Sequence, residues 1–197
     1  MAEGKASDEE LKRRFNCVRF NSSTLHCCND PTMPELKQLS KNAIPAALEK
    51  AERYRLLNEP AEAESICLDV LAAEPENQQA LITLLLAVTD RFSKSYGVSD
   101  TQAKQILTRI RGEYEHAYYS GILAERRAKA QLARGTPGCG HQAYDGFREA
   151  MDWFEKAEAV RPAGHDDALL RWNTCARMID KNHLTAREDE RIELPLE

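Results

Sequence analysis

Two stretches of this chain, 87 residues apart, repeat one spacing of small, bulky and proline residues. Counted from the first alanine, a bulkier residue follows after four positions, a small or apolar residue after seven and a proline after twelve. The positions are Ala63, Cys67, Val70 and Pro75 in the first stretch and Ala150, Phe154, Ala157 and Pro162 in the second. Residues spaced by four and seven share one face of an α-helix, and helices usually end before a proline. The spacing therefore predicts two helices that pack closely through small residues and end alike.

Apolar residues at helical spacing continue through most of the chain, and no segment alternates with the period of a strand. Only 7% of the residues are aromatic, and the abundant Ala, Leu, Glu, Lys and Arg favour helix. We predict a first helix beginning at the capping box Thr32–Glu35. Further helices are expected over about 44–57, 60–73, 78–92, 99–110, 113–133, 145–161 and 166–182. Residues 92–98 and 135–140 are expected to be loops.

The two ends of the chain differ from its middle. Residues 1–31 are expected to form a flexible arm, residues 32–181 a helical domain, and residues 182–197 a charged, mobile tail. The net charge of −5 gives no basic surplus for nucleic acid. The longest apolar run, 80–88, is shorter than the ~20 residues of a membrane span, and residues 1–14 lack the apolar core of a signal peptide. We therefore expect a cytoplasmic protein with reduced cysteines and no nucleic-acid or membrane partner.

The repeated spacing resembles the tetratricopeptide repeat (TPR) family, whose helix pairs end in an A-x3-F…P pattern. Upstream, Ala51-x2-Tyr54 resembles the family's small-x2-Tyr element. The resemblance implies an all-α solenoid of three stacked antiparallel helix pairs with a closing C-terminal helix, over about 44–181. Pro75 and Pro162 are 87 residues apart, whereas two repeats of about 34 residues would span about 68, so insertions are expected. Tyr118 or Tyr119 would supply the third aromatic. The alternative is a generic helical bundle.

The resemblance also implies a concave groove lined by the first helix of each pair. Carried over by register, the groove residues would be Leu48, Glu52, Arg55, Ile82, Leu86, Thr89 and Arg127. Such a groove, with an apolar floor and charged edges, suits an amphipathic helix or an extended peptide. The alternative is that the N-terminal arm or the helix at Thr32 covers Ile82 and Leu86. The family's carboxylate clamp uses Lys and Asn where this chain has Leu48 and Glu52, so binding of chaperone tails is not expected.

We therefore expect a non-enzymatic scaffold that binds another protein or peptide, without catalytic residues, cofactor or metal, because no nucleotide-binding, metalloprotease or serine-hydrolase motif occurs. One alternative is a metal-binding or thiol-dependent module. It would use the candidate ligands Cys17, His26, Cys27 and Cys28, or the pair Cys139 and His141. Another alternative is a structural protein that self-associates through the ends of its helical stack.

Overall fold

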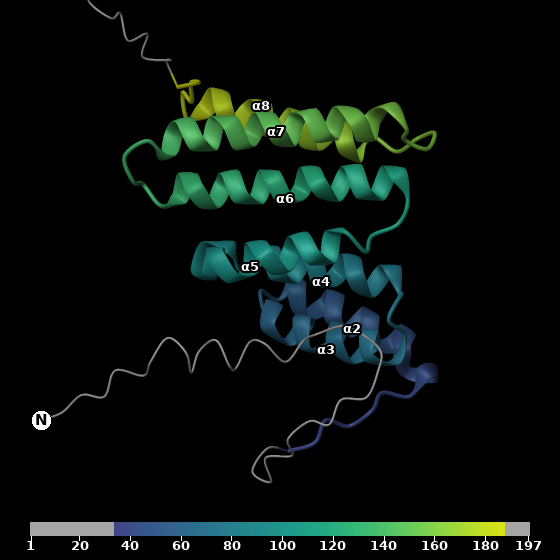
Figure 1. Ribbon diagram of the computed structural model, residues 1–197. Helices are drawn as coiled ribbons and strands as arrows, with labels where there is room; N and C mark the ends of the chain where they lie inside the picture. Colours follow the sequence, from purple (N-terminus) through teal and green to yellow (C-terminus); the bar gives the residue numbers. More distant parts are fainter. Residues whose placement is uncertain (1–33, 188–197) are drawn as a thin grey trace, which may run out of the picture. The chain divides into compact units, whose positions relative to one another are not determined.

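The computed structural model describes residues 34–187, whose secondary-structure elements are all helices. The chain divides into two units, Met1–Lys37 and Gln38–Glu197, and every described helix lies in the second (Figure 1). The elements are the 3-10 turn η1 (Lys41–Ala43) and the helices α2 (Ile44–Leu56), α3 (Pro60–Ala73), α4 (Gln78–Asp90), α5 (Phe92–Leu107), α6 (Glu113–Ala133), α7 (Cys139–Ala159) and α8 (Asp167–Lys181). The predicted all-α class is confirmed for this part of the chain.

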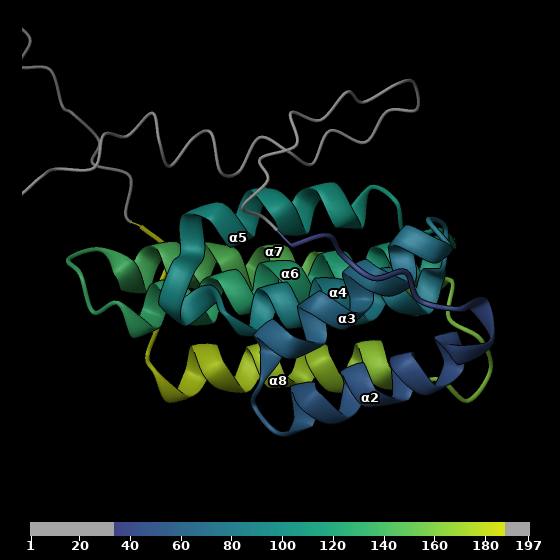
Figure 2. The same cartoon turned by 90° about the horizontal axis from the view of Figure 1, so that it is seen from below.

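Consecutive helices pack against one another along the whole described unit. Each helix from α2 to α8 contacts the next one in the chain, and α4 also contacts both α2 and α6. In Figure 1 the succession runs from α2 and α3 at one end to α7 and α8 at the other. Figure 2 views the same helices after a quarter turn, with α2 and α8 along one side and α5 along the opposite side.

Local sequence signals explain where several helices begin and end. Proline occupies the first turn of α2 and of α3, where its missing N–H costs nothing. The Asn77 side chain caps α4 by accepting a hydrogen bond from the backbone N–H of Ala80 at 3.0 Å. Gly112 precedes α6 with a φ of 90°, which a residue with a side chain rarely adopts.

The core consists of two clusters that meet at α4 and α6. One cluster holds the buried apolar side chains of α2 to α5 together with Leu123 and Ala130 of α6, and the other holds the remaining ones of α6 to α8. Tyr119 of α6 packs against both clusters, and Leu86 of α4 packs against the second. The repeated small residues are fully buried between helices, namely Ala51, Ala63, Ala150 and Ala157. Their lack of bulk permits the close approach that the sequence predicted.

Three boundary predictions were wrong. Residues 92–98, expected as a loop, belong to α5, which begins at Phe92. Phe92 is only 3% exposed, so burial of its ring anchors this turn against the core. The helix expected over about 99–110 consequently begins earlier and ends at Leu107. Residues 34–40 carry no helix, which overturns the helix predicted at Thr32 for the described part. The third error concerns α7, which starts at Cys139 and not near Asp145.

The early start of α7 has a packing explanation. Ala143 and Phe147 are both fully buried and extend the apolar stripe of Ala150 back towards the loop. The segment after α8 also contacts this end, because Nδ1 of His141 lies 2.9 Å from the carbonyl oxygen of Thr185. The expected arm, 1–31, and residues 188–197 of the expected tail lie outside the described residues.

Candidate functional site

A hollow of about 470 Å³ lies between α2, α4 and α6. Its lining residues come from all three helices and are Glu52, Arg55, Leu56, Gln79, Ile82, Thr83, Leu86 and Tyr119. Four of the seven residues predicted for the groove line it, namely Glu52, Arg55, Ile82 and Leu86. The hollow thus brings together residues that are about thirty positions apart in the sequence.

The floor of the hollow is apolar and one of its edges is an exposed leucine. Ile82 and Leu86 are half-buried on α4, one helical turn apart. Leu56, at the end of α2, is 86% exposed. Burial raises the pKa of Tyr119 to about 12, so its phenol remains neutral at physiological pH. These side chains offer contact area to an apolar group.

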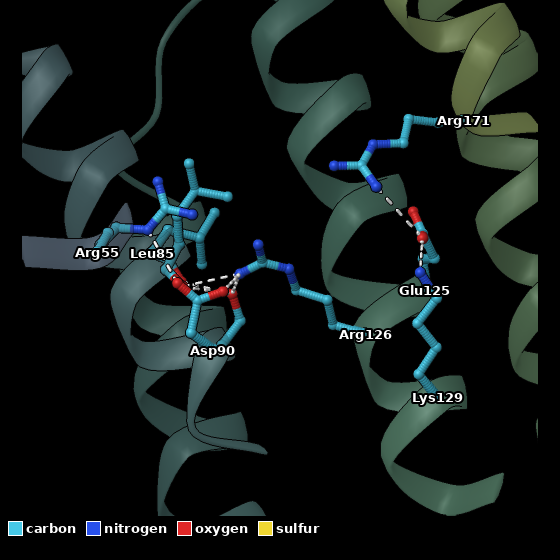
Figure 3. A network of polar contacts seen from close by, with 9 residues as sticks. Arg55, Leu85, Asp90, Glu125, Arg126, Lys129 and Arg171 are labelled. Atoms are coloured by element: carbon cyan, nitrogen blue, oxygen red, sulfur yellow. Dashed lines mark hydrogen bonds and ion pairs between the residues drawn. The ribbon is translucent and has the colours of Figure 1, made fainter. Parts of the chain in front are cut away.

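Arg55 forms the polar edge of the hollow, and its interhelical ion pairs extend beyond the lining to Asp90 and Arg126, as Figure 3 shows. Nε of Arg55 on α2 donates to Oδ2 of Asp90 on α4 at 2.9 Å. Nη1 of Arg126 on α6 lies 2.8 Å from the other carboxylate oxygen of Asp90. At the α2 side, Nε2 of Gln79 donates to Oε1 of Glu52 at 3.1 Å. One carboxylate therefore joins three helices through two guanidinium groups.

The three other predicted groove residues lie elsewhere. Leu48 is 5% exposed and belongs to the first core cluster. Thr89 is buried, and its hydroxyl donates to the carbonyl oxygen of Leu85 at 2.8 Å. Arg127 turns away from α4 and pairs with Asp100 of α5 at 3.0 Å and with Glu149 of α7 at 3.6 Å.

Sequence reasoning missed the residue that takes this place, Arg126. Its Nη1 donates to the Leu86 carbonyl oxygen at 2.8 Å and also to the Thr89 hydroxyl. Arg126 and Arg127 are adjacent, and the chain has no local signal that distinguishes which of them faces α4. An α-helix turns about 100° per residue, so an error of one position moves a side chain to another face.

A second polar cluster lies between α6 and α8, as Figure 3 shows. Glu125 of α6 is 1% exposed. Its Oε1 accepts hydrogen bonds from Nζ of Lys129 and, at 3.4 Å, from Nη1 of Arg171 on α8. Its Oε2 is buried without a hydrogen-bond partner. A buried carboxylate needs such cationic neighbours to offset its loss of hydration.

The structure gives little support to the candidate catalytic and metal-binding residues. Cys17, His26, Cys27 and Cys28 lie outside the described residues. Cys139 is a half-buried free thiol at the start of α7, and the exposed His141 contacts the Thr185 carbonyl oxygen. Within residues 34–187, no cluster of three or more His, Cys, Asp or Glu side chains is arranged to hold a metal ion.

The buried thiols are unsuited to nucleophilic chemistry. Burial raises the pKa of Cys67 to about 12, and burial likewise raises the pKa of Cys175 to about 12. Because the thiolate is the nucleophile and the metal ligand, both groups are inert near neutral pH.

Comparison with known proteins adds no assignment. No protein family, no curated protein and no solved structure matches the chain. In the part of the chain that the structure describes, no helix has the length and apolar character needed to cross a membrane.

Proposed function

We propose that the helical unit is a TPR-like solenoid that binds a peptide segment of another protein in the hollow between α2, α4 and α6. The helix order supports this architecture: α2 with α3, α4 with α5, and α6 with α7 would form the three pairs, and α8 would close the stack. The contacts of α4 with both α2 and α6 support it further, because the first helices of successive pairs adjoin in such a stack.

One observation carries the proposal, namely the coexistence of apolar and charged groups in an open hollow. Leu56, Ile82 and Leu86 offer apolar contact, and Glu52 and Arg55 lie on the polar edge. Binding surfaces for peptides combine apolar anchors with a charged rim in this way.

The proposal is tested by comparing two variants that add the same charge at exposed leucines. Leu56→Glu alters the hollow, whereas Leu68→Glu alters an exposed position on α3. Both side chains are exposed, so both variants should keep the helical circular-dichroism spectrum of the unchanged chain. Each tagged protein is crosslinked in its own host cells, and the attached proteins are quantified by mass spectrometry.

We expect Leu56→Glu to deplete a definite set of crosslinked proteins by about tenfold, because burying a charge against an apolar ligand is unfavourable. Leu68→Glu should leave that set unchanged. Equal recovery with the two variants would contradict binding in the hollow. Recovery of only this same chain, lost with Leu56→Glu, would instead favour the self-associating alternative.

A further inference from the structure

The guanidinium groups at the edge of the hollow have N–H donors to spare. Arg126 uses only Nη1 for its three acceptors, the Leu86 carbonyl, the Thr89 hydroxyl and the Asp90 carboxylate. Arg55 uses Nε for Asp90. Among the described residues, no hydrogen-bond acceptor is recorded for Nη2 of Arg126 or for the two terminal nitrogens of Arg55. A guanidinium carries five donors, so both groups can bind a further acceptor.

Each of two polar clusters has one more positive than negative charge. At the edge of the hollow, Arg55 and Arg126 share the single carboxylate of Asp90, and between α6 and α8, Lys129 and Arg171 share that of Glu125. Glu52 also lines the hollow and Glu115 acts on Tyr119, so the surplus belongs to the arginine edge and not to the hollow as a whole. The sign is opposite to that of the whole chain, whose net charge is −5. Such a local reversal favours a negatively charged partner.

Arg126 is a largely buried cation of this edge. Its side chain is only 20% exposed. Burial lowers the pKa of Arg126, and the neighbouring Arg55 and Arg171 lower it further, while Asp90 offsets part of the effect. An incoming carboxylate would replace the lost hydration of this cation, and Arg is suited to bidentate binding of carboxylates.

The chemistry of the floor decides between the classes of anionic partner. Ile82 and Leu86 line the hollow together with Arg55, so a ligand that fits needs an apolar group next to its negative charge. Tyr119, also in the lining, adds the aromatic side chain that often accompanies arginine in the energetic centre of protein interfaces. A nucleic-acid backbone has phosphates but no aliphatic side chain between them. A peptide with acidic and aliphatic residues has both.

We propose that the hollow takes an acidic peptide segment of another protein, with Asp or Glu bound by Arg55 and Arg126 and a neighbouring aliphatic side chain seated on Ile82 and Leu86. This inference rests on the proposed function and narrows its partner by chemical class.

The test uses a displayed library of short random peptides, selected against the full chain. Peptides recovered from the unchanged protein are synthesised with a fluorescent label, and their dissociation constants are measured by fluorescence anisotropy at low and at high salt. Arg126→Gln is compared with Arg127→Gln. These adjacent arginines are equally buried, with side chains 20% and 18% exposed, and each pairs with acidic groups of another helix. Of the two, only Arg126 bonds to a residue that lines the hollow, through the Leu86 carbonyl oxygen.

We expect the selected peptides to be rich in Asp and Glu next to Leu, Ile or Phe. Arg126→Gln should weaken their binding by about tenfold, and Arg127→Gln by less than about twofold. Binding should weaken as salt rises. Arg55→Gln, which keeps the Arg126–Asp90 pair, provides a second variant if Arg126→Gln loses its helical spectrum, and it too should weaken binding.

Three results would overturn the inference. Neutral or basic peptides that are lost with Leu56→Glu would refute the acidic partner while leaving peptide binding in the hollow intact. A single-stranded oligonucleotide that displaces the peptides at equal concentration would show that the arginines recognise phosphate. Failure to select any peptide, or selection of peptides that Leu56→Glu and Arg126→Gln bind normally, would refute the proposed function together with the inference.

Discussion

Replacement of Gly121 by alanine probes a close contact between α6 and α7. Gly121 lies in α6 and faces Phe154 of α7, whose ring is fully buried. A Cβ atom at position 121 would lie 2.5, 2.7 and 2.9 Å from three ring carbons of Phe154. Ordinary contacts of this kind begin at about 3.4 Å, so the ring or the whole of α7 must move. The second copy of the repeated spacing places Phe154 at this point.

Two opposing contributions set the size of the stability change expected for Gly121→Ala. Alanine is the better helix former, which favours the variant by about 1 kcal/mol. Overpacking a filled core costs about 1–3 kcal/mol, and three short contacts with a ring that has no free space indicate the upper part of that range. We therefore expect a net loss of about 1–2 kcal/mol in the free energy of unfolding. For a chain of this size, that corresponds to a fall in Tm of roughly 2–8 °C.

The assay is urea unfolding followed by circular dichroism, with Gly140→Ala as the matched control. Gly140 also lies in a helix, but the nearest atom to its added Cβ is Cδ2 of Leu184 at an ordinary 3.8 Å. Gly140→Ala should therefore be neutral or stabilise by up to about 1 kcal/mol. Replacing the ring by a smaller side chain, with Phe154→Leu, should lower the free energy of unfolding less in the Gly121→Ala background than in the unchanged chain. If Gly121→Ala stabilises as much as Gly140→Ala, the packing described for α6 and α7 is wrong.

Two further predictions concern the buried polar groups. Arg171→Met removes one of the two cations, Arg171 and Lys129, that pair with the buried Glu125 carboxylate. We expect the free energy of unfolding to fall by about 1–3 kcal/mol, measured by urea unfolding. Most of this loss should vanish in a Glu125→Leu background, and additive effects of the two substitutions would argue against the pair. The pKa values of Cys67 and Cys175 are raised from 9.0 to about 12, so their contribution to stability is complete below pH 9 and is lost as the pH rises towards 12. Above pH 9 each thiol should remove about 1.4 kcal/mol per pH unit, measured as a falling urea midpoint. The slope should flatten when both cysteines are replaced by valine, and an unchanged slope would show that other groups cause it.

Much of the helical structure could be predicted because its causes are local. Proline in the first turns of α2 and α3 and the side-chain cap of α4 at Asn77 act within a few residues, as does the periodicity of apolar side chains. The helix predicted over 113–133 agrees with α6, Glu113–Ala133. Predictions failed where burial overrode local signals. Residues 92–98 belong to α5 and not to a loop, because the Phe92 ring is buried in the core.

The candidate site was only partly predictable for a related reason. The groove positions that the TPR resemblance implied on α2 and α4 include four residues that line the hollow, which lie three or four positions apart and so share a helix face. Spacing within α6 did not distinguish Arg126 from Arg127. That choice depends on how α6 is rotated against α4, and the rotation follows from the packing of Tyr119 between two core clusters.

The sequence alone therefore determined that the chain is helical, where most helices lie and which of their faces are apolar, since these properties arise from interactions between near neighbours. Only the tertiary structure decided that Asp90 joins Arg55 to Arg126 and that Leu56, Ile82 and Tyr119 border one hollow. These contacts join residues about thirty or more positions apart. Their geometry depends on the rotation and offset of whole helices, which the combined packing of the core sets and no local pattern encodes.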